Sequence, residues 1–146
     1  MNPTQPPTRA PTAAELLADP VVQTALDQAW IDSQPQEPVG VRHEEGGWVY
    51  LDLAKGQLSV LRAARGIGDA IDLSNPPAVG GSVVVGKFHT HPNPAAEGWY
   101  TGPSPADLIV DARHGVPDLI RAEDRTHACG PASRRGGLAG GPGYPP

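Results

Sequence analysis

Three side chains that commonly bind metal ions lie within a short stretch of the sequence: His89, His91 and Asp107. The two histidines follow a β-branched run, and alternate residues of a strand point to the same face. Both imidazoles can therefore reach one zinc ion, whose bonds to nitrogen are about 2.0–2.1 Å long. Two histidines and one carboxylate leave a fourth position open, which is typical of catalytic zinc sites. The spacing thus predicts a metal centre that can act on a substrate.

A helix must position the aspartate, and Ser104 begins it. Serine as N-cap, Pro105 at the first helical position and an acid at the third form a helix start, and Gly115 is a natural C-cap. Ser104 and Asp107 then share the helix N-terminus, where partial positive charge favours anions. Both residues could simply cap the helix, and an aspartate can cap through one oxygen and bind metal through the other.

Hydrolysis at such a centre needs two further groups. A base must accept the proton of the attacking water, and a donor must stabilise the oxyanion that forms on the attacked carbonyl. Ser104 is placed to be the donor, and a glutamate from elsewhere would be the base.

The motifs His89-x-His91-Pro92 and Ser104-x-x-Asp107 together resemble the signature of the JAMM (MPN-type, JAB-like) zinc metalloproteases. Members of this family also carry an upstream glutamate ahead of a strand. The segment Glu44-Glu45-Gly46-Gly47 has that form, and Glu44 fits the spacing whereas Glu45 does not. The Gly-Gly-aromatic strand and the Phe-His-Thr-His-Pro turn resemble bacterial members associated with phages and polymorphic toxins.

The resemblance implies one zinc ion per chain and a role for each matched residue: His89, His91 and Asp107 as metal ligands, Glu44 as the general base, and Ser104 as the oxyanion donor. Glu45 stays open as an alternative base, with the opposite strand-face parity. A solvated pair of loop glutamates is a third interpretation of Glu44 and Glu45.

The resemblance also implies a zinc metallopeptidase or isopeptidase that hydrolyses a peptide or a ubiquitin-like protein substrate. Its fold would be α/β, a JAMM/MPN-like (cytidine-deaminase-like) central mixed β-sheet flanked by helices. Two alternatives remain: an inactive JAMM-fold binding or scaffold module, and a peptidase effector (toxin) domain, either of them in a larger assembly. The segment 92–103 is longer than expected for the family, and we expect its Trp99 and Tyr100 at the substrate cleft.

The remaining elements follow from capping signals and apolar periodicity. Thr12 and Asp19-Pro20 start helices, the second of which runs to about Ser33 with one apolar face. Strands are expected over 47–53, 58–61, 71–73 and 82–88, and a closing hairpin over 118–121 and 126–129. This order predicts an α/β domain with a central sheet and flanking helices.

Composition sets the boundaries of that domain. Of 146 residues, 18 are Gly and 18 are Pro, and 12 of these 36 lie in the 24 residues of the segments 1–11 and 134–146. We therefore expect a metallopeptidase domain over residues 12–133, a disordered Pro-rich tail over 1–11 and a disordered Gly/Pro-rich tail over 134–146.

Charge and cysteine content exclude several classes of function. The net charge of −5 is spread without a basic run, so we expect no nucleic-acid partner. No apolar stretch reaches 18 residues, so we expect no membrane partner. The single cysteine, Cys129, excludes an intrachain disulfide and a Cys-rich zinc cluster. The N-terminus lacks the apolar core of a signal peptide, which favours a cytoplasmic location, although export without a signal peptide would leave no trace.

Overall fold

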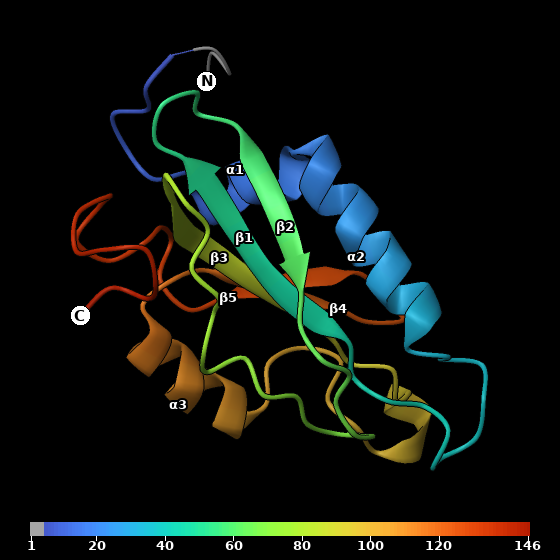
Figure 1. The fold of residues 1–146 in the computed structure, drawn as a ribbon. Coiled ribbons are helices and arrows are strands. Elements are labelled where there is room, and N and C mark those ends of the chain that lie inside the picture. Colours follow the sequence, from blue (N-terminus) through green and yellow to red (C-terminus); the bar gives the residue numbers. More distant parts are fainter. Residues whose placement is uncertain (1–4) are drawn as a thin grey trace.

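A five-stranded mixed sheet lies between helices in the computed structural model, which describes residues 5–146 (Figure 1). The elements in chain order are α1 (Ala13–Ala18), α2 (Pro20–Asp32), β1 (Gly46–Asp52), β2 (Leu58–Arg62), β3 (Ser82–Thr90), the 3-10 helix η1 (Ala95–Glu97), α3 (Pro105–His114), β4 (Asp118–Arg121) and β5 (Thr126–Cys129). Of the helices in this part of the chain, none is long and apolar enough to cross a membrane.

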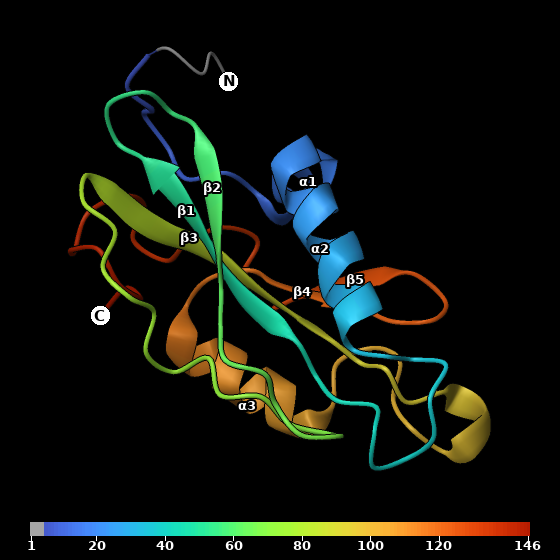
Figure 2. The same ribbon diagram turned by 45° about the vertical axis from the view of Figure 1, so that its right-hand side comes forward.

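The strand order in the sheet is β2-β1-β3-β4-β5. Strands β3 and β4 pair in parallel and the other neighbours are antiparallel. Helix α3 forms the crossover between the parallel strands, while α1 and α2 lie on the opposite face (Figures 1 and 2). The expectation of an α/β domain with a central mixed sheet flanked by helices is confirmed.

Each helix begins where its capping signal predicts. Thr12 and Ser104 form capping boxes with Glu15 and Asp107, the acids three residues further on. Asp19 accepts hydrogen bonds from the first backbone amides of α2. These side chains satisfy amide groups that a helix start leaves without partners. Local sequence therefore fixes where α3 starts, and with it the position of Asp107.

The two faces of the sheet bury separate apolar clusters. Alternation along β1 sends Val49 and Leu51 toward α1 and α2, and Trp48 and Tyr50 toward the α3 side. The first cluster is completed by Ala10, Leu16, Val22, Leu26, Ala29, Val83, Val85, Phe88 and Leu119, and the second by Leu73, Val84 and Val116.

A β-bulge in β3 decides which face the first histidine joins. Val49 pairs with Gly86 and Tyr50 pairs with Val84, so Val85 is an extra residue on β3. A bulge shifts the side-chain alternation by one residue. Without it, His89 would share the face of Val85, toward α1 and α2. With it, His89 turns toward α3.

The expected C-terminal tail is packed against the domain. Arg134 is 2% exposed and donates to the carbonyl oxygens of Val84, Ala139, Gly141 and Gly143. In the segment 134–146, for which we expected disorder, one arginine thus holds three backbone carbonyls close to β3. Four of the segment's glycines adopt positive φ and serve as turns.

The segment 1–11 was expected to be a disordered tail, and part of it contacts the domain. Residues 1–4 lie outside the described residues. Within the described part, Ala10 is buried and Arg9 forms two hydrogen bonds with Glu15 at 2.6 and 2.8 Å.

The expected short strand over 71–73 is wrong, because this segment is irregular and buries Leu73 beside the Trp48 indole instead.

Candidate metal centre

The two histidines lie at the end of β3, where the strand leaves the sheet. His89 is the second-last residue of β3 and His91 follows the strand, and their side chains are 6% and 9% exposed. Their Nε2 atoms are 3.1 Å apart. Two imidazole nitrogens at this distance are close enough to be ligands of one ion, and without an ion one of them can donate a hydrogen bond to the other.

Asp107 joins the histidines from the first turn of α3. Its Oδ1 lies 3.4 Å from Nε2 of His89, and its Oδ2 lies 3.2 Å from Nε2 of His91. A tetrahedral ion with bonds of about 2.0–2.1 Å holds its ligand atoms roughly 3.3–3.4 Å apart. The distances of 3.1–3.4 Å are close to this spacing, although the two histidines face different oxygens of Asp107. Hydrogen bonds from both histidines outweigh burial and hold the pKa of Asp107 far below its usual range.

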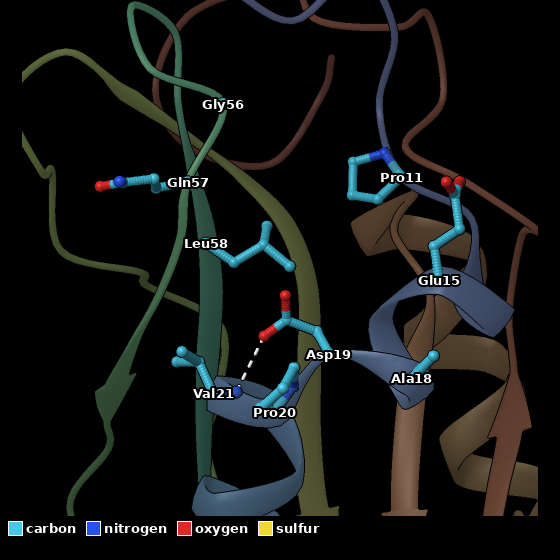
Figure 3. Close-up of a pocket in the computed structure, with 9 residues that line it drawn as sticks. All are labelled: Pro11, Glu15, Ala18, Asp19, Pro20, Val21, Gly56, Gln57 and Leu58. Atoms are coloured by element: carbon cyan, nitrogen blue, oxygen red, sulfur yellow. Dashed lines mark hydrogen bonds between the residues drawn. The ribbon is translucent and has the colours of Figure 1, made fainter. Parts of the chain in front are cut away.

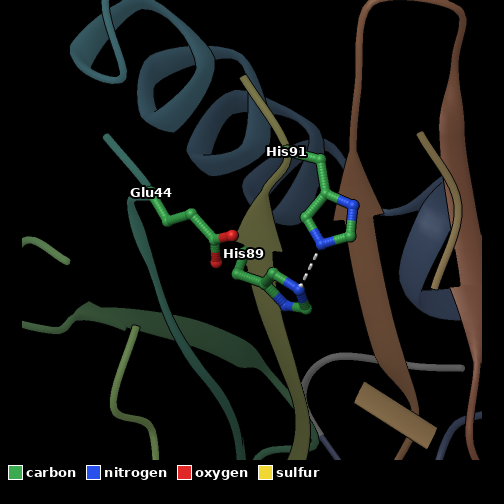
Figure 4. Close-up of side chains that lie close together, drawn as sticks. All are labelled: Glu44, His89 and His91. Atoms are coloured by element: carbon green, nitrogen blue, oxygen red, sulfur yellow. Dashed lines mark hydrogen bonds between the residues drawn. The ribbon is translucent and has the colours of Figure 1, made fainter. Parts of the chain in front are cut away.

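Glu44 directs its carboxylate toward His89 and His91 (Figure 4). Its carboxylate oxygen and the ring nitrogens of His89 and His91 all lie within 4.8 Å of one another. The backbone of Glu44 pairs with the segment 66–67, which holds it extended ahead of β1. Burial raises the pKa of Glu44 to about 7, although both histidines oppose that shift. A carboxylate with such a pKa suits proton transfer near neutral pH.

Glu45 is turned away from the metal centre. One oxygen lies 2.6 Å from Nε2 of His43 and the other accepts a hydrogen bond of 2.7 Å from Arg62. The two glutamates alternate across the extended backbone, so only one of them can face the histidines. The structure places Glu44 there.

Gly46 lets β1 approach the histidine strand closely. It pairs with His89, and a Cβ on Gly46 would lie 2.3 Å from the carbonyl oxygen of Phe88. A larger residue would push β1 and β3 apart, because the atom in contact is a backbone oxygen and cannot rotate away as a side chain can. The glycine therefore fixes the separation between the Glu44 segment and the histidines.

Ser104 performs its capping role. Its hydroxyl oxygen accepts from the amide of Asp107 at 3.1 Å, and Asp107 Oδ2 accepts from the amide of Ser104 at 2.9 Å. The same Oδ2 is the atom close to His91. Capping and the position of the candidate ligand are thus parts of one arrangement, and the hydroxyl hydrogen of Ser104 is left to donate.

Sequence reasoning missed a side chain that contacts His89 from behind. Asp118, the first residue of β4, is 1% exposed, and its Oδ1 lies 3.2 Å from Nδ1 of His89. Burial opposes ionisation of Asp118, but His89 and Lys87 outweigh it and lower its pKa. Burial alone would lower the pKa of His89, yet Asp118 and Asp107 raise it well above the ordinary value. This pocket therefore attracts positive charge.

A buried lysine lies next to Asp118. Nζ of Lys87, a residue 2% exposed, is 2.9 Å from Oδ1 of Asp111, 4.0 Å from Oδ2 of Asp118 and 2.7 Å from Nδ1 of His114. Burial and repulsion from Asp118 raise the pKa of Asp111 to about 6. The only signal for this cluster in the sequence was a lysine inside a β-branched strand.

Asp111, Asp118 and Cys129 form a second group with metal-binding side chains. The thiol of Cys129 donates to Oδ2 of Asp111 at 2.9 Å, and burial raises its pKa well above the usual value. A thiol must lose its proton to bind a metal. With the ammonium of Lys87 already among the carboxylates, this second group is an ion cluster, not a metal site.

A cavity of about 200 Å³ opens from the metal centre under α3. The helix lines it with Ala106, Asp107, Val110, Asp111 and His114, which recur at helical spacing on one face. The apolar residues Leu108 and Ile109 point outward and are 50% and 58% exposed. Helix α3 thus turns acidic side chains inward and two apolar side chains toward solvent, whereas an ordinary amphipathic helix does the opposite.

A larger hollow, about 650 Å³, lies between the α1–α2 junction and the β1–β2 turn (Figure 3). Its two acids are already used: Glu15 pairs with Arg9, and Asp19 caps α2. None of the predicted site residues lines it. The chemistry therefore points to the smaller cavity.

The long loop after His91 is anchored at several points. Glu97 pairs with the buried Arg42 at 2.7 Å, and Asn93 donates to the carbonyl of Gly68 at 2.7 Å. Trp99 and Tyr100 are 39% and 61% exposed on this loop. They are available to a partner molecule, while their expected place at a substrate cleft remains a prediction.

The chain matches no protein-family model, no curated protein and no solved structure. What supports a function is therefore the site itself. The structure brings together Glu44, His89 and His91, a group that can hold a metal ion. Asp107 lies within 3.4 Å of both histidines, and Ser104 is bonded to Asp107.

Proposed function

We propose that this chain is a JAMM-like zinc metallopeptidase. The observation that carries the proposal is the spacing of 3.1–3.4 Å among the Nε2 atoms of His89 and His91 and the carboxylate of Asp107. Nitrogen and carboxylate donors at this spacing suit zinc. The electrostatics agree, because the carboxylates of Asp107 and Asp118 together raise the pKa of His89 and favour a cation at this position.

The chain's own residues would divide the work of hydrolysis. When bound, zinc supplies Lewis acidity that polarises a carbonyl and lowers the pKa of water. Glu44 then accepts the proton of the attacking water and delivers it to the departing amine. The hydroxyl of Ser104 donates to the developing oxyanion. Glu44 and Asp107 both line the cavity under α3, where a substrate could reach them.

A matched pair of variants tests the general base. We expect Glu44→Gln to lower the turnover of short fluorogenic peptides, or of a lysine-linked isopeptide analogue, by about 10²- to 10⁴-fold. Glu45→Gln removes the same charge next to it and should retain most activity. A chelator should abolish the hydrolysis and added zinc should restore it.

Zinc content must be measured on the same preparations. The proposal requires about one zinc ion per chain, lost in a double variant that replaces His89 and His91 by alanine. Protein that binds no zinc would refute it. Protein that binds one zinc ion and hydrolyses none of these substrates would point to the binding or scaffold module instead.

A further inference from the structure

One ring nitrogen of His89 faces the candidate ligands, and the other faces Asp118. A neutral imidazole carries its hydrogen on only one nitrogen. If Nδ1 donates to Asp118 Oδ1, at 3.2 Å, then Nε2 keeps a free lone pair toward His91 and Asp107. The hydrogen-bond partner behind the ring thus selects the tautomer that can bind a metal.

We propose that Asp118 is a positioning residue that fixes the tautomer and ring orientation of His89 for zinc, and that Lys87 secures Asp118. This inference rests on the proposed metal centre. Asp118 lies directly opposite Lys87 in the parallel pair of β3 and β4, so the sheet register itself sets the contact. Lys87 and His89 are two residues apart on the same face, which lets one carboxylate serve both.

The cost of burying these charges supports a role beyond stability. Lys87, Asp111 and Asp118 are each 1–2% exposed, and apolar side chains of similar volume often stabilise such positions equally well or better. By contrast, Nδ1 of His91 is buried and has no hydrogen-bond partner among residues 5–146. Only one of the two histidines is held from behind, so zinc affinity should depend strongly on Asp118.

Asp118→Asn and Asp111→Asn form a matched pair. Each removes one carboxylate charge from the same buried cluster, but only Asp118 contacts His89. An asparagine at 118 can offer an amide hydrogen to Nδ1, which would move the ring hydrogen to Nε2 and block the metal-binding atom. Asparagine at 111 leaves the contact between Asp118 and His89 in place.

The experiment measures the zinc dissociation constant of the full chain by competition with a chromogenic chelator. We expect Asp118→Asn to bind zinc about 10- to 100-fold more weakly, and Asp111→Asn to stay within about threefold of the unmodified chain. Thermal unfolding of both variants identifies any loss of fold. Equal losses in the two folded variants, or no loss in Asp118→Asn, would overturn the inference.

A second measurement needs no variant and no metal. Nitrogen NMR of the metal-free chain at alkaline pH, where the His89 imidazole is neutral, should show its hydrogen on Nδ1. A hydrogen on Nε2 would contradict the inference even if the variants fail to fold. If the chain binds zinc but cleaves nothing, the peptidase proposal fails while the affinity comparison still decides the role of Asp118. If it binds no zinc, the proposed metal centre and this inference both fail.

Discussion

Both faces of the sheet bury an apolar cluster, but only the face toward α3 also buries a group of charged side chains. Toward α1 and α2, the buried side chains are apolar, with Leu16 and Val22 fully buried and Leu26 3% exposed. Toward α3, Lys87 and Asp118 are buried as deeply, beside the candidate metal ligands. Burying an apolar side chain of this size contributes about 1.5–3 kcal/mol, whereas a buried charge stabilises nothing unless it is paired.

Helix orientation shows the same contrast. Helix α2 buries Leu26 and Ala29, as its apolar periodicity predicts. Helix α3 instead turns Asp107 and Asp111 inward and leaves Leu108 half exposed. Burying acidic side chains and exposing apolar ones destabilises a helix unless polar contacts offset the cost. In α3 those contacts surround the candidate metal centre. The difference indicates that one face of the sheet supplies stability and the other holds chemically useful groups.

The largest effect that tests this contrast is expected from Lys87→Met. Removing the ammonium leaves Asp111 buried without its cation and Asp118 with His89 alone, which should lower the free energy of unfolding by about 3–5 kcal/mol. Urea unfolding of the metal-free chain measures it. Lys55→Met, at an exposed turn position, is the matched control and should change stability by less than about 0.5 kcal/mol.

A combined variant sharpens that result. Adding Asp111→Asn and Asp118→Asn to Lys87→Met removes all three charges, and most of the lost stability should return. If Lys87→Met changed the free energy of unfolding as little as Lys55→Met, then Lys87, Asp111 and Asp118 would not be a coupled ion cluster. The difference between the two faces of the sheet would then not be supported.

The opposite face should respond in stability alone. Leu26→Ala removes a buried side chain of α2 and should lower the free energy of unfolding by about 3 kcal/mol. Zinc affinity of the folded variant should match that of the unmodified chain, since α2 carries no candidate ligand. Ile31→Ala, 65% exposed on the same helix, should leave both quantities nearly unchanged. Weakened zinc binding in folded Leu26→Ala would mean that the two faces are not independent.

Much of the fold could be predicted because the signals are local. The capping boxes at Thr12 and Ser104 and the β-branched run before His89 need only neighbouring residues to act, and each produced its element. The candidate ligands His89, His91 and Asp107 were found for the same reason: strand alternation and a helix start are short-range rules.

What could not be predicted depends on strand pairing. The bulge at Val85 turns His89 toward α3, and it exists only because β1 and β3 pair in that register. Asp118 reaches His89 only through the parallel pairing of β3 and β4. The C-terminal segment is held against β3 by Arg134, which acts across 50 residues to bond Val84. None of these contacts leaves a pattern in the local sequence.

A pH effect of intermediate size should come from the polar face, at His114. Burial and the charge of Lys87 lower the pKa of His114 to about 4, and its ring stacks on Tyr144. A lowered pKa means that the unfolded chain binds the proton more readily. The stabilisation is therefore complete above about pH 6.5 and is lost as the pH falls toward 4, by on the order of 2 kcal/mol after allowance for solvent screening.

His114→Gln isolates this contribution. Glutamine can accept from Lys87 but does not titrate, so the difference in unfolding free energy between the variant and the unmodified chain should vary with pH only in that window. Urea unfolding at pH 7 and at pH 4.5 provides the comparison. Parallel pH profiles for the two proteins would show that His114 does not hold the neutral form.

The smallest expected effect on stability tests whether Ser104 does more than begin a helix. Ser104→Ala removes the N-cap acceptor and should lower the free energy of unfolding by about 1 kcal/mol, while Ser104→Gly should cost only a few tenths. Both variants lack the hydroxyl. If that hydroxyl stabilises the oxyanion, both should lose peptide turnover by a similar factor of about 10²–10³ despite their different stabilities. Ser104→Thr keeps both the cap and the hydroxyl and should retain activity. Turnover that followed stability, with Ser104→Gly nearly as active as the unmodified chain, would leave Ser104 as a capping residue that only positions Asp107.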